Sequence, residues 1–183
     1  MSEDNARWRS AVYQALCACL GLTPGSAAAD TLLQPAWSEP EPTPQAPRQR
    51  NVIYYALARD DSAEPLRKTL VCTGREGSEK PAAVQGLLAY SLRVICYGPE
   101  AEDNAERIRC MLVPDGAGSP RAILRKAGVY PIPDPPQPQV LAETESGLYR
   151  RRADLAVSLR VRQELKTKQP GIASVPNIIV HGR

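Results

Sequence analysis

The strictest constraint on the fold lies in residues 148 to 165, "LYRRRADLAVSLRVRQEL". From residue 153 onward, apolar and polar residues alternate with the two-residue period of a β-strand, not the 3.6-residue period of a helix. A strand with this pattern has one buried face and one face in water. The predicted buried face holds Ala153, Leu155, Val157, Leu159 and Val161, and the predicted wet face holds Arg152, Asp154, Ala156, Ser158, Arg160, Arg162 and Glu164.

The length of this strand is a second constraint. At about 3.3 Å per residue it reaches on the order of 40 Å, whereas a usual strand has about five or six residues. A sheet of ordinary size covers only part of such a strand. We therefore expect it to project beyond its own sheet.

The same stretch is basic, which raises the alternative of a nucleic-acid contact. Residues 148–168 hold seven bases and two acids, although the chain as a whole has a formal net charge of only +3. A sequence-independent nucleic-acid module interleaves stacking aromatic residues with its bases, and here only Tyr149 lies near. The alternation therefore favours arginines on the wet face of a strand, and the nucleic-acid module remains the alternative.

Two proline-rich segments divide the chain into three ordered blocks. Residues 35–47 and 131–138 each hold five of the eighteen prolines. Proline fixes φ and lacks an amide donor, so neither segment is predicted to form a helix or a central strand. We interpret both as extended loops that run along a neighbouring surface; a ligand for a proline-recognising module is the alternative. The predicted organisation is a single domain over 1–165 with these two insertions, followed by an extended C-terminal tail over 166–183.

The remaining blocks predict helices and three further strands. A helical period and a closing Gly21 mark a helix in "NARWRSAVYQALCACLGL". Residues 51–60, 66–73 and 86–98 are predicted as three strands of an antiparallel meander. Two more helices are expected over 99–113, where an acidic first turn suits the helix dipole, and over 119–128. The fold class is thus α+β: a mostly antiparallel four-stranded sheet with helices packed on one side.

Residues for catalysis or metal binding are scarce. The five cysteines lack metal-binding spacing, and His181 is the only histidine. Glu102 and Asp103 are expected in the first turn of a helix, which explains these two acids without catalysis. Residues 142–146, "AETES", could hold a metal together with Asp154, but we interpret them as a solvated loop. The phosphate-binding and serine-nucleophile motifs are missing from the sequence. We expect no catalytic residue, cofactor or metal, no membrane span or signal peptide, and reduced thiols in a cytoplasm.

Particular residues resemble the tail-terminator and neck proteins of tailed bacteriophages. The resemblance runs over roughly residues 5–165 and rests on "NVIYYALARD", "LAYSLRVICYGPEAEDNAERIRCMLV" and above all "ESGLYRRRADLAVSLRVRQE", which is similar to the family's closing strand. The proline clusters and the tail from Lys166 onward depart from the family's pattern. An enzyme with an unrecognised site, a head-completion protein and a tail-tube subunit remain alternatives.

The resemblance implies a non-enzymatic virion protein in the tail or neck, made in the host cytoplasm during assembly. Such a protein forms a ring, sixfold in the family, that caps the head-proximal end of the tail tube. Its implied partners are further copies of itself, the tail tube protein, the head–tail connector and the DNA that passes through the lumen. The subunit or tube interface is expected at Arg150, Arg151, Arg152, Arg160 and Arg162.

Overall fold

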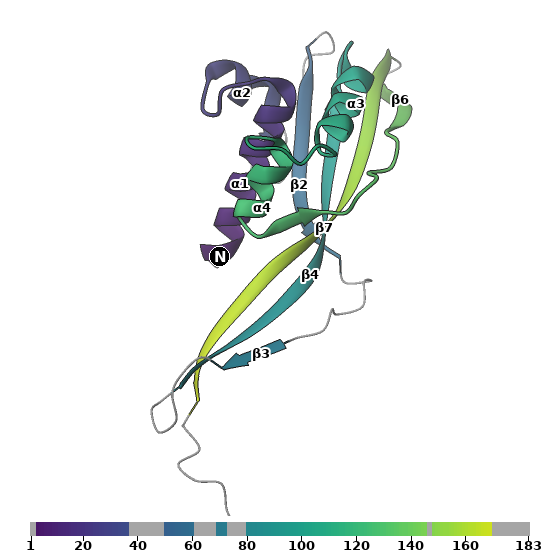
Figure 1. Cartoon of the computed structure of the whole chain (residues 1–183). Helices are drawn as coiled ribbons and strands as arrows, with labels where there is room; N and C mark the ends of the chain where they lie inside the picture. Colours follow the sequence, from purple (N-terminus) through teal and green to yellow (C-terminus); the bar gives the residue numbers. More distant parts are fainter. Residues whose placement is uncertain (1–2, 37–49, 61–68, 73–79, 146–147, 170–183) are drawn as a thin grey trace, which may run out of the picture.

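The computed structural model describes residues 3–36, 50–60, 69–72, 80–145 and 148–169 (Figure 1). Two of the segments discussed above lie outside the described residues: 37–47 of the first proline-rich segment, and 170–183 of the expected tail, which includes His181. In the described part the fold is α+β. The helices are α1 (Glu3–Leu20), α2 (Ala27–Leu32), α3 (Ala101–Met111) and α4 (Pro120–Lys126), and the strands are β1 (Leu33–Pro35), β2 (Val52–Arg59), β3 (Thr69–Cys72), β4 (Lys80–Tyr97), β5 (Val129–Pro131), β6 (Gln139–Glu145) and β7 (Leu148–Gln169).

Two long strands form the centre of the sheet. β4 and β7 pair antiparallel over the full length of β4, from Lys80 opposite Gln169 to Tyr97 opposite Arg152. The other edge of β4 carries β2 and β3, and the other edge of β7 carries β6 and β5. β1 joins β2 in parallel. Figure 1 shows that β4 and β7 run well past the helices as a narrow twisted ribbon, beside which lies β3.

The helices α1, α3 and α4 cover one face of the upper half of the sheet (Figure 1). The apolar stripe of α1 and the inward side chains of α3 pack there against the odd-numbered residues of β7. Burial of apolar side chains on this scale is the main driving force for folding. The largest fully buried side chains of this core are Leu16, Ile53, Leu92, Ile108, Leu112, Leu124, Leu155 and Leu159.

Glycines end two elements at positive φ. α1 ends at Leu20 and Gly21 follows at φ 71°, as the sequence predicted. Gly98, at φ 110°, turns the chain from β4 into α3. A β-carbon at Gly98 would lie 2.6 Å from Asn51 Oδ1, and the Asn51 side chain accepts from the backbone N–H of Glu100 at 3.0 Å. The turn therefore needs glycine for both its conformation and its space.

The alternation in β7 is confirmed. Ala153, Leu155, Val157, Leu159 and Val161 are each at most 2% exposed. Of the expected wet face, Ala156, Ser158 and Arg162 are exposed, and Arg152, Asp154 and Arg160 are half-buried. The strand does not project beyond its sheet, because β4 pairs with it as far as Gln169; the two strands together run past the helices. On the other edge of β7, the last described strand ends opposite Val161. β7 itself runs four residues into the segment expected to be an extended tail.

Two expectations about the sheet are wrong. The described sheet has seven strands and one parallel pairing, not four strands. β2 and β3 do not form a meander with β4, since both lie against the same edge of β4, at its two ends. β1 and β5 have only three residues each, which is too short for a period to be read from sequence. β4 is long enough for β2 and β3 to pair with different parts of the same edge.

Replacing Leu159 by alanine should lower the free energy of unfolding by about 2–5 kcal/mol, because Leu159 is fully buried between the sheet and the helices. The matched control is Ser158→Ala, one residue away on the exposed face, which should change it by less than about 0.5 kcal/mol. Urea unfolding followed by circular dichroism measures both. A larger loss for Ser158→Ala than for Leu159→Ala would contradict the register.

Candidate functional site

The five arginines expected at an interface do not form one site. Alternation along β7 sends Arg151 to the helix-covered face, where its Nη2 atom lies 3.5 Å from Glu102 Oε2 of α3. Both of these side chains are more than half exposed, so the pair contributes little to stability. The even-numbered arginines belong to the opposite face of the sheet, which we call the open face.

At the upper end of the open face, two arginines pack on an aromatic pair. The guanidinium of Arg150 lies 4.1 Å from the ring centre of Tyr97, and that of Arg152 lies 5.7 Å from it. Tyr97 in turn meets Tyr54 of β2 edge to face, with ring centres 6.0 Å apart. Arg150, one of the five arginines expected at an interface, is only 9% exposed. Stacking on the ring explains its burial.

Arg152 is held by carboxylates as well as by the ring. Its Nε and Nη2 atoms donate to the two oxygens of Asp154 at 2.7 and 2.8 Å, and its Nη1 atom lies 3.7 Å from Glu143 Oε1 of β6. The bonds to Asp154 raise the pKa of Arg152, and burial raises the pKa of Tyr97. Two of the three carboxylates considered for a metal, Asp154 and Glu143, therefore pair with an arginine. Within the described ranges, three or more metal-ligating side chains do not come together.

A groove of about 370 Å³ lies on the open face next to Arg152. Arg93, Ile95 and Ala156 form its floor, and Pro136 and Gln137 of the second proline-rich segment form part of its wall. The start of this segment is tied to β7, because Ile132 N donates to Ser158 O at 2.9 Å. The segment therefore lies along its own sheet in this structure, rather than along a neighbouring surface as the sequence suggested.

Farther down the open face, the remaining two arginines stand at the beginning of the ribbon. Arg160 lies opposite Ala89 and Arg162 opposite Leu87, which is 39% exposed. Among the described residues, ion pairs involve Arg151 and Arg152 but neither Arg160 nor Arg162. Of the five arginines, these two are the ones best placed to meet another molecule.

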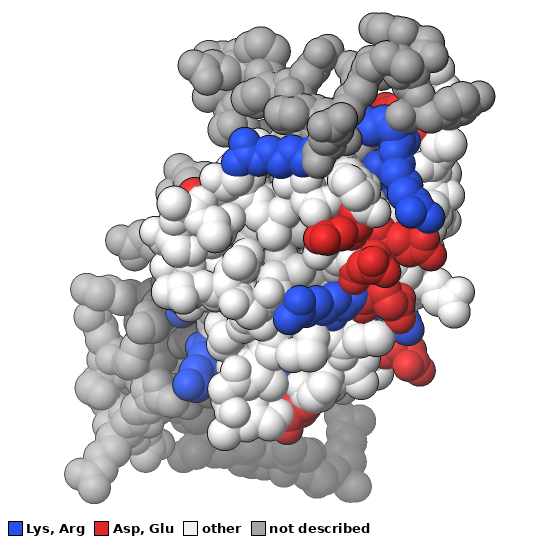
Figure 2. All heavy atoms as spheres, turned by 90° about the horizontal axis from the view of Figure 1, so that it is seen from above, with Lys and Arg blue, Asp and Glu red and all other residues white. Residues whose placement is uncertain are grey.

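Acidic side chains gather at the opposite end of the molecule. Figure 2 shows them on the end where α3 begins, with basic side chains around them. Glu100, Glu102 and Asp103 are exposed there, and Glu143 of β6 lies on the same end of the sheet. The upper end of the sheet thus carries charges of both signs, and Arg160 and Arg162 lie away from these acids, where the ribbon begins.

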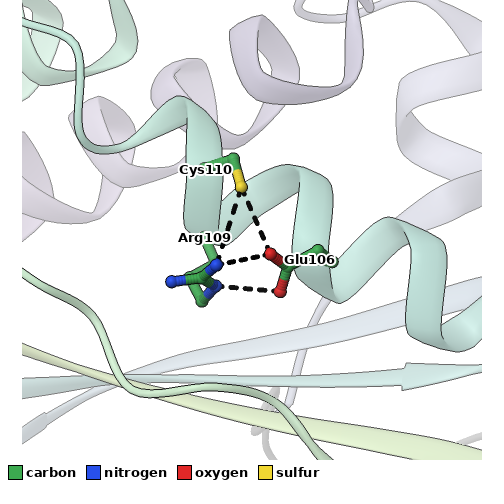
Figure 3. Close-up of polar contacts among 3 residues, drawn as sticks. All are labelled: Glu106, Arg109 and Cys110. Atoms are coloured by element: carbon green, nitrogen blue, oxygen red, sulfur yellow. Dashed lines mark hydrogen bonds and ion pairs between the residues drawn. The ribbon is translucent and has the colours of Figure 1, made fainter.

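Cys110 is an exposed thiol on α3 and so a candidate nucleophile. Its sulfur lies 3.3 Å from Glu106 Oε1, and Arg109 Nε donates to the other oxygen of that carboxylate at 2.8 Å (Figure 3). The bond to Glu106 raises the pKa of the Cys110 thiol, while Arg109 and Cys110 lower the pKa of Glu106. A nucleophilic cysteine needs the opposite shift, toward thiolate.

One surface was missed by the sequence reasoning. Residues 142–146 were interpreted as a solvated loop and residues 139–141 were given no element, yet β6 forms an edge strand with Val140 and Leu141 exposed by 48% and 43%. Its apolar pair stands between a proline cluster and three polar residues, so it gives no two-residue period. The available signal was the absence of proline from residues 139–145.

Glu106→Gln should accelerate alkylation of Cys110. In the native protein the raised pKa keeps the thiol protonated to higher pH, so near pH 8.5, the usual thiol pKa, less than half should be thiolate. Removing the carboxylate charge lowers the pKa and raises that fraction. Iodoacetamide labelling read by peptide mass spectrometry measures the rate. Asp103→Asn removes one charge from the same helix without a bond to Cys110 and is the control; equal acceleration in both variants would contradict a direct effect.

Comparison with known proteins supplies one match. A family model described as "phage neck terminator protein" matches residues 9–183. The matched range includes residues 166–183, which the resemblance seen in the sequence had left outside the family's pattern. Among curated proteins, none matches the chain.

Proposed function

Because the chain belongs to the phage neck terminator protein family, we propose that it forms a ring that caps the head-proximal end of the tail tube and joins it to the head–tail connector. Family membership itself implies a structural protein of the virion's tail or neck that associates with other tail and head–tail proteins. In the part of the chain that the structure describes, no helix is long and apolar enough to cross a membrane.

The observation that carries the proposal is the projecting half of the β4–β7 ladder. Beyond Val161, the β7 edge that carries β6 and β5 meets no further strand among the described residues. Apart from the four residues of β3, the projecting part has only two strands, and a two-stranded ribbon is marginally stable in water by itself. A ribbon of this length is therefore suited to complete its packing on another molecule, as a ring subunit does on its neighbour or on the tube.

The contacts of the five arginines support two different roles for them. Arg150 and Arg152 are tied to Tyr97 and hold the upper end of the sheet, and Arg151 pairs with Glu102. Arg160 and Arg162 are the proposed contacts to a neighbouring subunit or to the tube. A role as structural subunit requires no reacting group, and the protonated Cys110 thiol agrees with that role. The sixfold ring count is taken from the family resemblance.

Purified protein mixed with tail tubes that lack a terminator should bind as closed rings at one end of each tube and stop further growth. Negative-stain microscopy and tube-length distributions measure both effects, and light scattering gives the mass of the ring. Tubes with no bound cap and unchanged length, together with a protein that stays monomeric, would contradict the proposed function.

The double variant Arg160→Glu with Arg162→Glu should remain folded but cap tubes poorly. Both residues lie on the open face, Arg162 exposed and Arg160 half-buried, and charges that reach solvent contribute little to stability. An interface built around these cations would meet repulsion. Thermal melts, size-exclusion chromatography and tube capping measure this. The matched control, Arg125→Glu on the exposed side of α4, should cap normally.

The same variant separates assembly from DNA binding, the second function that two arginines on the open face allow. If these arginines bind the DNA backbone, wild-type affinity for duplex DNA falls steeply with rising salt and is lost in the variant. If they serve assembly, rings and capping persist at moderate salt and DNA binding is weak in both proteins.

A further inference from the structure

The outer edge of β6 is an unpaired strand edge. Within the described ranges, β6 pairs only with β7, from Gln139 opposite Asp154 to Glu145 opposite Leu148. It contains no proline, and Val140 and Leu141 are exposed on its two faces. Proteins usually protect a seven-residue edge of this kind with proline, lysine or a covering loop, because it is a template for another strand. β6 has none of the first two.

Two backbone hydrogen bonds of β7 indicate which groups of β6 face outward. Arg151 O accepts from Gly98 N beside β4, whereas Ser158 O accepts from Ile132 N on the β5–β6 side. Odd-numbered residues of β7 thus bond toward β4 and even-numbered residues toward β6. The β6 residues opposite Arg150, Arg152 and Asp154 therefore bond inward, because an antiparallel ladder alternates. By that alternation Val140, Ala142 and Thr144 direct their N–H and C=O groups away from the sheet.

A second open edge lies at the other end of the same β7 strand. β5 pairs with β7 only as far as Val161, and Arg162 N donates to Gly128 O at 2.8 Å. The alternation continues, so the backbone groups of residues 164, 166 and 168 point to the β5–β6 side, where no other described strand lies. Residues 162–169 span about 26 Å at roughly 3.3 Å each. β6, with seven residues, has nearly the same length.

The two edges are complementary in charge. β6 holds Glu143 and Glu145 and no base. Residues 162–169 hold Arg162, Lys166 and Lys168 against Glu164. Opposite charges on neighbouring strands stabilise their pairing, and like charges oppose it. An acidic edge therefore faces a basic one when these strands meet, whereas two copies of either edge repel.

One copy cannot join these two edges to each other, because they lie on the same side of one continuous strand, at opposite ends. Any pairing between them joins two molecules through different surfaces, and such contacts close into a ring when the rotation allows. We propose that the free β7 edge at residues 162–169 of one copy adds as a strand to the outer edge of β6 in a second copy. This contact supplies the interface of the ring and so rests on the proposed function.

Ala142→Pro tests the β6 edge directly. Proline removes an outward N–H and leaves the inward bonds of β6 to β7 in place. The matched control is Ala142→Thr, which keeps the N–H and favours a strand. Wild type and Ala142→Thr should form rings, and Ala142→Pro should associate at least about tenfold more weakly, which is about 1.4 kcal/mol. Rings of unchanged strength in a folded Ala142→Pro protein would overturn the proposal.

A charge exchange tests the partner and does not depend on the proline variant folding. Glu143→Lys with Glu145→Lys should lose rings, and so should Lys166→Glu with Lys168→Glu. All four changes together should restore them, because the two edges become complementary again. Light scattering measures the mass in each case. If the double variants lose rings and the fourfold variant does not recover them, or if neither double variant loses rings, the proposed contact is contradicted.

The failure of this contact and the failure of the proposed function give different results. If wild-type protein forms rings and caps tubes while the edge variants do so equally well, another surface makes the ring and the function stands. If wild-type protein neither forms rings nor caps tubes, the proposed function itself is wrong, and the contact with it.

Discussion

The antiparallel ladder between β4 and β7 is the constraint on which the rest of the structure depends. It joins strands separated by two helices and a proline-rich segment, and every other strand except β1 pairs with one of these two. Its upper half receives the helices on one face and neighbours on both edges. Without that ladder, β2, β3, β5 and β6 would be short strands with no common sheet.

The length of the ladder divides the molecule into two parts with different physics. Where α1, α3 and α4 cover it, alternating side chains build a core of fully buried leucines and valines. Where it leaves the helices, the same backbone pairing continues with less to pack against. Backbone pairing alone adds little net stability, because the unfolded chain forms such bonds with water. The projecting half is therefore the part of the molecule that gains most from a partner.

Charge follows the same division. At the upper end, arginines of β7 meet carboxylates and an aromatic ring of their own molecule: Arg152 with Asp154, Arg151 with Glu102, Arg150 with Tyr97. Toward the ribbon, Arg160 and Arg162 stand opposite alanine and leucine. The arginines at the upper end are therefore used within the molecule, whereas the two toward the ribbon are in none of the ion pairs found among the described residues.

The period-two pattern from Ala153 to Val161 determined by itself that β7 is a long strand and which side chains it buries, because these are properties of one strand and one buried face. The helical periods and Gly21 did the same for α1. The partners of each strand were decided only by tertiary structure: sequence did not disclose that β2 and β3 share one edge of β4, or that β6 forms an exposed edge. Nor did it separate Arg150, stacked on Tyr97, from Arg162 in water. Those differences arise from contacts between residues far apart in the chain, and a local pattern carries no record of them.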